Sequence, residues 1–298
     1  MRLDRSPHVR SPMTCTQSLL VFAPFRGRIA RCAVLTLTAF VSQTTSPAAA
    51  FAETPEGATL RTDLSSDDVQ VFGLDNTLWL QLAPGALARK QADIPRLCAP
   101  LREMKWNSAP DAELKIVPEP DHWRVSWKSQ PSDSSVIELV FDAPPILPGD
   151  CPRTPPAGDG SVLLRACQAR TTGEKLRYEP QWYKNTVGYW TIPSDYAAWR
   201  LSIEQPGTYS VAVLQGCGAG QGGSDAVLDL RQDDQVIAKL PFQTVETGHF
   251  QNFRWHHLGH LSVDQRGDCE LRITPTRIAK NALFDVRMVH LVRQAAAP

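Results

Sequence analysis

The sequence has no excess of basic residues. Its 31 Lys and Arg are balanced by 31 Asp and Glu. Residues 1–52, which we interpret below as an export signal, contain six Arg and one Asp, so the rest of the chain carries 25 basic and 30 acidic residues. A net negative charge argues against binding to nucleic acid or to an anionic membrane surface.

The common catalytic patterns are also missing, since the chain has neither G-x-S-x-G nor H-E-x-x-H. One stretch, GCGAGQGGS at 216–224, places Gly218, Gly220 and Gly223 at the G-x-G-x-x-G spacing of a dinucleotide-binding loop. That loop works only between a strand and a helix. Residues 209–215 and 224–230 both alternate apolar and polar side chains with a period of two, which indicates strands. We therefore predict a flexible loop between two strands.

Metal-binding patterns are scarce as well. The seven cysteines include no C-x-x-C pair, and adjacent His256 and His257 would point to opposite faces of a strand, which favours a polar strand edge over a metal site. An exported protein can form disulfides. The odd number of cysteines after residue 52 leaves at least one of them without an intramolecular partner, and their spacing fixes no pairing; Cys217–Cys269 is one hypothesis. The five are Cys98, Cys151, Cys167, Cys217 and Cys269.

The apolar stretch near the N-terminus is short. Three arginines between positions 26 and 31 precede apolar residues 32–41, and Ala50-Phe51-Ala52 matches an A-x-A cleavage site. A stop-transfer helix needs about 20 apolar residues. We predict that residues 1–52 are a signal peptide, that the protein is secreted or periplasmic, and that no membrane span remains after cleavage. An uncleaved anchor is the alternative.

Prolines divide the remaining chain. Six of them lie between positions 144 and 156, where they exclude helix and central strand. We predict a Pro-rich linker at 144–161 between a small β-sandwich at 53–143 and a second β-sandwich at 162–293. Short alternating segments separated by turn residues dominate both parts, so the predicted fold class is all-β. Only residues 86–103 could hold helix, and Pro95 and Pro100 interrupt them.

Aromatic residues are the most informative feature. Seven Tyr and Trp lie between positions 178 and 199, many of them beside turn residues, and 247–253 reads Thr-Gly-His-Phe-Gln-Asn-Phe. A sugar ring presents an apolar C–H face and a rim of hydroxyls, which an aromatic platform and nearby amides match. We expect Trp199, ahead of an alternating strand, in the core. For Tyr189 and Phe250, near predicted loops, exposed binding and burial stay equally open.

The second part resembles carbohydrate-binding modules of the family 6 and 35 type, which are β-sandwiches of the galactose-binding kind. The resemblance covers about 162–292 and depends on the order of six segments. They are Asn185-Thr-Val-Gly-Tyr-Trp-Thr, Asp195-Tyr-Ala-Ala-Trp-Arg-Leu, Gln205-Pro-Gly-Thr-Tyr-Ser-Val, Gly222-Gly-Ser, Thr247-Gly-His-Phe-Gln-Asn-Phe and Phe284-Asp-Val.

The resemblance implies a glycan or polysaccharide partner. It places Tyr189 or Trp190 at one wall of the family's aromatic clamp and Phe250 at the facing ring. It puts Asp285 near a position that often helps to hold a structural calcium. Because Ala166-Cys-Gln-Ala169 replaces the family's early glutamate ligands, we expect no cofactor. The implied carbohydrate-binding residues are Tyr189, Trp190, His249, Phe250, Gln251 and Asn252.

The first part is similar to the β-sandwich that follows the catalytic barrel in α-L-fucosidases. The similar segments are Leu78-Trp-Leu-Gln-Leu, Leu101-Arg-Glu-Met-Lys-Trp, Leu114-Lys-Ile, His122-Trp-Arg-Val and Val136-Ile-Glu-Leu-Val-Phe. The barrel itself needs about 200 residues or more, and no stretch of that length precedes residue 70 after the expected cleavage.

We therefore expect a secreted, non-catalytic carbohydrate-binding protein, not an enzyme. Two alternatives stay open. One is a structural or protein-interaction module of the cell envelope, with its aromatic residues mostly in the core. The other is a glycoside hydrolase, for which Asp225, Glu246 and Asp285 are the candidate carboxylates, although no spacing pairs them.

Overall fold

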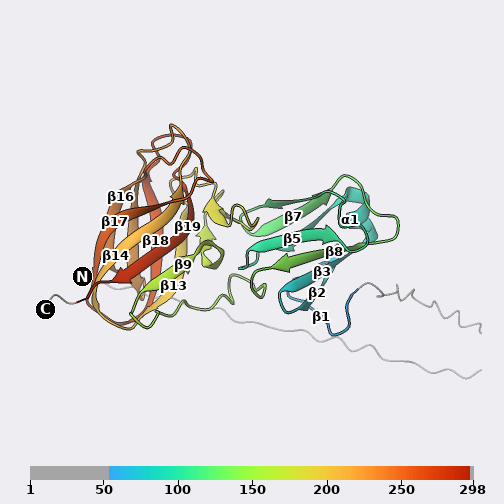
Figure 1. The fold of residues 1–298 in the computed structure, drawn as a ribbon, viewed down its shortest axis with the longest axis horizontal. Helices are drawn as coiled ribbons and strands as arrows, with labels where there is room; N and C mark the ends of the chain where they lie inside the picture. The colour runs from blue at the N-terminus through green and yellow to red at the C-terminus, as the bar shows by residue number, and fades with distance from the viewer. Residues whose placement is uncertain (1–53, 296–298) are drawn as a thin grey trace, which may run out of the picture. The chain divides into compact units, whose positions relative to one another are not determined.

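The computed structural model describes residues 54–295, whose regular secondary structure is almost entirely β-strand. The predicted signal peptide at 1–52 lies outside the described residues. Every strand pairing is antiparallel, and the strands group into four sheets (Figure 1). The predicted all-β sandwich class is confirmed.

The strands that precede residue 142 form two sheets. One has the order β1-β2-β3-β8-β5 and the other β4-β7-β6. Aromatic rings from the two sheets pack together: Trp106 meets Trp127 edge-on at 5.3 Å, and Trp123 stacks on Phe141 at 6.4 Å. The strands are β1 (Thr59–Leu60), β2 (Val69–Leu74), β3 (Thr77–Leu82), β4 (Gln91–Pro95), β5 (Leu101–Trp106), β6 (Leu114–Pro118), β7 (His122–Trp127) and β8 (Val136–Phe141).

Helix is shorter than the sequence allowed. Within residues 54–295 the single α-helix, α1, spans Pro84–Arg89, with its proline at the start, where no intrahelical N–H is needed. It ends at Lys90, whose φ of 58° is left-handed. Most of the rest of the predicted helical window, 86–103, forms β4, in which Ala92 and Ile94 are buried at alternate positions, and the start of β5.

The strands that follow residue 161 form the other two sheets, in the orders β10-β13-β18-β15-β16 and β11-β12-β19-β14-β17, with β9 beside β19. Trp199 is 1 % exposed, so its predicted core position is confirmed. The strands are β9 (Val162–Arg165), β10 (Arg170–Thr172), β11 (Arg177–Glu179), β12 (Thr186–Gly188), β13 (Tyr196–Ile203), β14 (Gly207–Gly216), β15 (Asp225–Gln232), β16 (Gln235–Gln243), β17 (Arg254–Val263), β18 (Gly267–Arg277) and β19 (Asp285–Arg293).

The segment 142–161 carries no named strand, and it touches both groups of sheets. The carbonyl of Ile146 accepts from the N–H of Cys98 at 2.8 Å, and the N–H of Thr154 donates to the carbonyl of Arg200 at 2.9 Å. Direct contacts join the groups as well, because the buried guanidinium of Arg96 donates to the carbonyl of Ala169 at 2.7 Å. Such contacts fix the strands that surround the candidate site.

The predicted disulfide is not formed, since all five described cysteines are free, buried thiols. Cys217 follows the last residue of β14, whereas Cys269 pairs with Leu201 near the end of the sandwich where β14 begins. Ten strand residues separate these ends by about 30 Å, and a disulfide needs Cα atoms within about 7 Å. The Cys217–Cys269 hypothesis is therefore wrong.

Cys98 and Cys151 do lie side by side. Their thiols hydrogen-bond to one another, and this bond is the main reason why the pKa of Cys151 is lowered to about 7. The same bond, together with burial, raises the pKa of Cys98. Arg96 lies beside this pair, and its guanidinium is 3.8 Å from the Cys98 sulfur.

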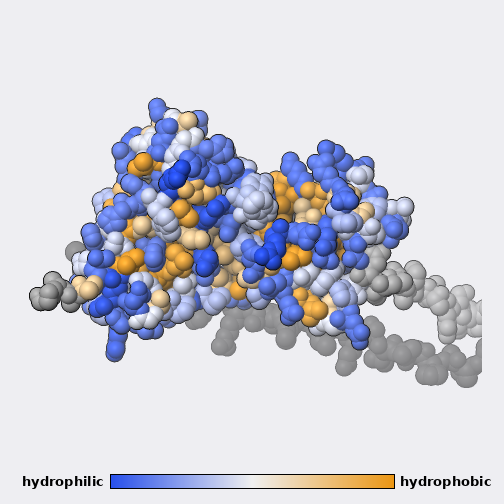
Figure 2. Space-filling model, in the orientation of Figure 1, coloured by the Kyte–Doolittle hydropathy of each residue, from blue (hydrophilic) through white to orange (hydrophobic). Residues whose placement is uncertain are grey.

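No helix among residues 54–295 is long and apolar enough to cross a membrane. On the face drawn in Figure 2, hydrophilic residues are interspersed with separate hydrophobic patches. Several large aromatic side chains stay exposed, and these lead to the candidate site: Trp182, Tyr183, Tyr189 and Trp255.

Candidate functional site

The glycine-rich stretch 216–224 supports the loop that carries Phe250. It connects β14 to β15, so the predicted loop between two strands is confirmed. Cys217 accepts from the N–H of Thr247 at 2.9 Å, and Gly248 accepts from the N–H of Ala219 at 3.1 Å. A Cβ on Gly216 would lie 1.9 Å from the carbonyl oxygen of Phe250. The glycine therefore allows the Phe250 loop to lie directly against the end of β14.

Tyr189 follows the end of β12 in an unusual backbone conformation. Its φ is 60°, in the left-handed region that bulky residues rarely adopt. The side chain is 47 % exposed, and the guanidinium of Arg177 lies 4.3 Å from the centre of its ring. Arg177 is itself held by Glu119, to which it donates at 2.8 Å. The surrounding structure thus fixes an exposed aromatic ring, and such strained positions gather at functional sites.

Tyr189 and Phe250 meet at a pocket of about 250 Å³. The pocket is built from the end of β11, the segments on either side of β12, the Phe250 loop and the start of β19. The structure therefore brings together three residues that the sequence analysis selected separately, namely Tyr189, Phe250 and Asp285. The complete lining is Glu179, Lys184, Tyr189, Thr191, Phe250, Ala282 and Asp285.

The floor of this pocket is charged. Glu179 is 3 % exposed and forms an ion pair with Lys184. Asp285 is 8 % exposed, and a Cβ added at Gly188 would lie 2.8 Å from an oxygen of Asp285 and 2.9 Å from one of Glu179. Burial, followed by the negative charge of Glu179, raises the pKa of Asp285 well above its ordinary value. The raised pKa extends the pH range in which Asp285 is protonated and can donate a hydrogen bond.

Lys184 is held in its charged form. Burial on its own would lower the pKa of its ammonium group, but the hydrogen bond and the charge of Glu179 outweigh burial, and the pKa is raised. The pocket therefore combines the ammonium group of Lys184 with the carboxyl groups of Glu179 and Asp285 beside two aromatic rings. This mixture of directional polar groups and flat apolar faces is what a polyhydroxylated ligand needs.

The raised pKa of Asp285 predicts a pH effect on stability. Above its ordinary pKa of 3.8 the unfolded chain releases a proton that the folded protein keeps, so stability falls as the pH rises from about 4 through the folded pKa. Asp285→Asn removes this term, and we expect it to flatten the fall. Urea unfolding at a series of pH values measures the effect. The exposed Asp264→Asn is the control, and equal slopes for the wild type and Asp285→Asn would contradict the prediction.

Trp190 does not belong to the site, which corrects its assignment to the aromatic clamp. Its side chain is 0 % exposed, its ring nitrogen donates to the carbonyl of Asp195 at 2.9 Å, and its ring lies 5.6 Å from that of Phe284. Tyr189, the preceding residue, has a left-handed backbone and a side chain that is 47 % exposed, so the two neighbours differ in burial. Tyr189 lines the pocket, and Trp190 lies in the core.

His249, Gln251 and Asn252 also lie outside the lining of the pocket. They shape the turn that presents Phe250: the imidazole Nδ1 of His249 accepts from the N–H of Gln251 at 3.1 Å. The side-chain amide of Asn252 donates to the carbonyl of Thr247 at 2.5 Å. These bonds hold the loop, and the implied contact of His249, Gln251 and Asn252 with a sugar stays a prediction.

Two residues that line this pocket carry no signal in the sequence. Of the three carboxylates considered from sequence, Asp225 pairs with Arg277 at 2.7 Å and Glu246 accepts from the N–H of Gly220 at 2.8 Å, so only Asp285 reaches the pocket. Its neighbour Glu179 was not considered, nor was Lys184. No local pattern marks these two residues, because their pairing with Asp285 depends on the contact of β12 with β19.

The structure offers little for a metal ion. Among residues 54–295, no group of three or more His, Cys, Asp or Glu side chains is arranged to hold one. Asp285 has Glu179 as its acidic neighbour, and Lys184 already pairs with that carboxylate. Calcium needs several oxygen ligands, and the ammonium group of Lys184 already pairs with one of the two carboxyl groups, so the residues of this pocket do not fit a calcium site.

The chain matches no family model and no curated protein. Among solved structures, it is similar to an α-L-fucosidase from Vibrio sp. strain EJY3, with 13% identity and a TM-score of 0.31 over 76% of this chain. This chain spans 40% of the length of that fucosidase.

Two carbohydrate-binding modules are also similar to the chain. The C-terminal CBM6 of LamC from Zobellia galactanivorans has 13% identity and a TM-score of 0.36, covering 45% of this chain and 99% of its own. A family 35 module from Clostridium thermocellum has 14% identity and a TM-score of 0.34, covering 45% of this chain and 98% of its own. Because these TM-scores are below 0.5, we build the proposed function on the geometry of this chain alone.

Proposed function

We propose that this protein is an exported, non-catalytic carbohydrate-binding protein and that Tyr189 and Phe250 hold a sugar ring in the pocket above Glu179, Lys184 and Asp285. The observation that carries the proposal is the convergence of two aromatic rings on a floor of hydrogen-bonding groups. The rings supply flat faces for the C–H side of a sugar, and the charged floor supplies donors and acceptors for its hydroxyls.

The exposure of the aromatic side chains supports glycan binding over a purely structural module. A structural module would bury its large aromatic residues, as this chain does with Trp190 and Trp199. Trp182 instead is 69 % exposed and Tyr189 47 %, and both lie beside pockets. Exposed rings next to a polar hollow are typical of binding surfaces. Exposed rings without a binding role promote aggregation.

The expected affinity is modest. Each aromatic contact adds about 0.5–1.5 kcal/mol beyond the buried area, so a short glycan should bind with a Kd of about mM to tens of µM. Phe250→Ala removes one of the two rings, and we expect at least about a tenfold loss of affinity. A glycan array followed by isothermal titration of the wild type and the variant measures this loss.

The matched control is Trp255→Ala, which removes a 52 % exposed ring that lines neither pocket described here. Thermal melts of both variants show whether the fold persists. Tyr189→Ala tests the facing ring and depends less on folding, because its side chain is half exposed. Wild-type affinity in folded Phe250→Ala and Tyr189→Ala would rule out the proposed site.

One observation favours a second candidate, a glycoside hydrolase. Glu179 and Asp285 both approach Gly188; Glu179 pairs with Lys184, and the pKa of Asp285 is raised. Hydrolases divide the roles of nucleophile and acid between two carboxylates in a similar way. Against this role, both side chains are almost fully buried. Release of shorter sugars from a bound glycan during the titration would support the hydrolase instead.

A further inference from the structure

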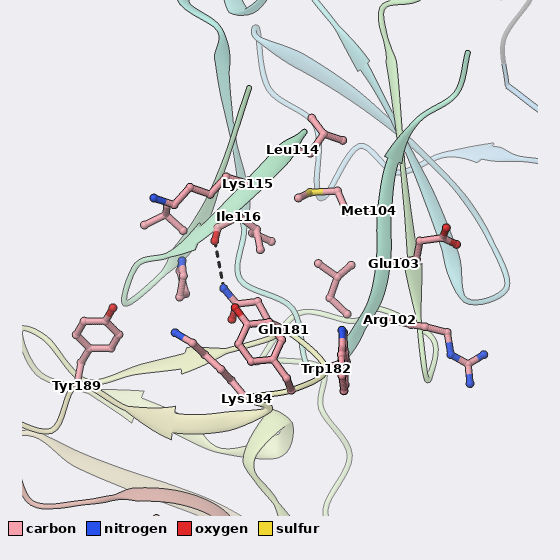
Figure 3. A pocket seen from close by; sticks show the side chains of 14 residues that line it. Arg102, Glu103, Met104, Leu114, Lys115, Ile116, Gln181, Trp182, Lys184 and Tyr189 are labelled. Atoms are coloured by element: carbon pink, nitrogen blue, oxygen red, sulfur yellow. Dashed lines mark hydrogen bonds between the residues drawn. The ribbon is translucent and has the colours of Figure 1, made fainter. Parts of the chain in front are cut away.

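A second, larger hollow continues from the proposed sugar pocket. Its volume is about 470 Å³, within the range of about 300–1,000 Å³ that is typical of small-molecule sites. Lys184 and Tyr189 line both hollows, so the two share a border. Figure 3 shows their side chains on one side of the hollow and the strand that carries Lys115 and Ile116 on the other.

The walls of this groove come from both groups of strands. β5 and β6 contribute side chains such as Met104 and Lys115, and the turn between β11 and β12 contributes Gln181 and Trp182. The side-chain amide of Gln181 donates to the carbonyl of Ile116 at 3.1 Å (Figure 3). This bond ties the turn to β6, so the two sides of the groove are joined directly.

The turn is also fixed from the other side. Arg287, on β19, donates to the carbonyl of Tyr183 at 2.7 Å and to the carbonyl of Lys184 at 3.0 Å. Trp182 meets Tyr183 edge-on, with 5.7 Å between ring centres, and is 69 % exposed. An ordered turn therefore presents a large aromatic face to solvent beside a polar groove. Because the turn is already ordered, the ring loses less entropy on binding than a ring on a flexible loop would.

We infer that the ligand is a linear glycan of several sugar units, which runs from the Tyr189–Phe250 pocket past Lys184 into the groove and ends over Trp182. This inference rests on the proposed function. Aromatic faces at the two ends of a continuous hollow fit the C–H faces of successive sugars, and Lys184 and Lys115 supply donors for the hydroxyls between them. β5 and β6 thus take part in binding, and the ligand is longer than the single sugar unit held in the Tyr189–Phe250 pocket.

The test measures affinity against chain length on the full exported chain. The probes are β-1,3- and β-1,4-linked glucose and mannose oligosaccharides of one to six units. For the wild type we expect affinity to rise with length. Trp182→Ala should lower the affinity for the longest bound oligosaccharide by about tenfold and leave the mono- and disaccharide unchanged, because it removes one stacking face in the groove.

The controls separate this inference from the proposed function. Phe250→Ala should weaken binding of every length, and Trp255→Ala should weaken none. If the wild type binds two and six units equally, or if Trp182→Ala binds six units like the wild type, the groove inference is wrong and the Tyr189–Phe250 site stands. If no probe binds the wild type at any length, both are wrong.

Discussion

Replacing Asp195 by alanine is expected to destabilise the protein by at least about 3 kcal/mol. The Asp195 side chain is 0 % exposed, and its two carboxylate oxygens accept from the backbone N–H groups of Glu174, Lys175 and Leu176, each at 2.9 Å. Alanine would leave three partly or fully buried donors without a partner, and each such donor costs about 1–3 kcal/mol. Urea unfolding monitored by tryptophan fluorescence measures the loss.

The matched control is Asp264→Ala, an exposed aspartate for which we expect a change within about 0.5 kcal/mol. Asp195→Asn separates shape from charge, because its amide keeps one acceptor oxygen and turns an N–H₂ group toward the other donors. It should lie between the wild type and Asp195→Ala. A loss below about 1 kcal/mol for Asp195→Ala would show that these three hydrogen bonds do not hold the turn.

The hydrogen bonds from the N–H groups of residues 174–176 to Asp195 also support the candidate site. Asp195 lies directly against Gly173, whose φ is 126° and whose added Cβ would lie 2.0 Å from a carboxylate oxygen of Asp195. Residues 174–176, which donate to Asp195, lead directly into β11, which carries Arg177 and Glu179. Asp195 is therefore a positioning residue: it fixes the strand that supports the Tyr189 ring and the floor of the pocket.

The fold class was accessible from sequence because several of the long strands alternate buried and more exposed side chains. β13 and β14 bury every second side chain over most of their length, as their period-two pattern predicted. Phe250 was accessible too, since a glycine and short polar residues surround it and mark a loop. Residues 86–103 were harder to assign, because a helical turn and two strands follow one another there within one short window.

The composition of the site was less accessible, because its residues meet only after the sheets have formed. Glu179 and Asp285 lie more than 100 residues apart in the chain, and the pairing of Val187 with Val286 brings their strands together. The groove adds strands β5 and β6, which no pattern in the sequence relates to the turn at 181–184. The sequence indicated which aromatic residues were candidates. Tertiary contacts determine that Tyr189 and Phe250 line the pocket and that Trp190 is buried.

The choice between adjacent aromatic residues gives the other large prediction. Trp190→Ala is expected to destabilise the protein by about 3–5 kcal/mol, because it opens a cavity against Phe284 in the core. It also removes the indole that donates to the carbonyl of Asp195. Tyr189→Ala, one position earlier, should cost about 1 kcal/mol or less, since its side chain is 47 % exposed.

These two variants form a pair with opposite expected effects on binding and stability. Folded Trp190→Ala should keep its glycan affinity at low temperature, whereas Tyr189→Ala should lose about tenfold while its unfolding free energy stays near that of the wild type. Trp190→Phe keeps a ring beside Phe284 but no donor for Asp195, and should fall between Trp190→Ala and the wild type in stability. If Tyr189→Ala proved the less stable of the pair, the division between pocket ring and core ring would be reversed, and the site would have to be rebuilt around Trp190.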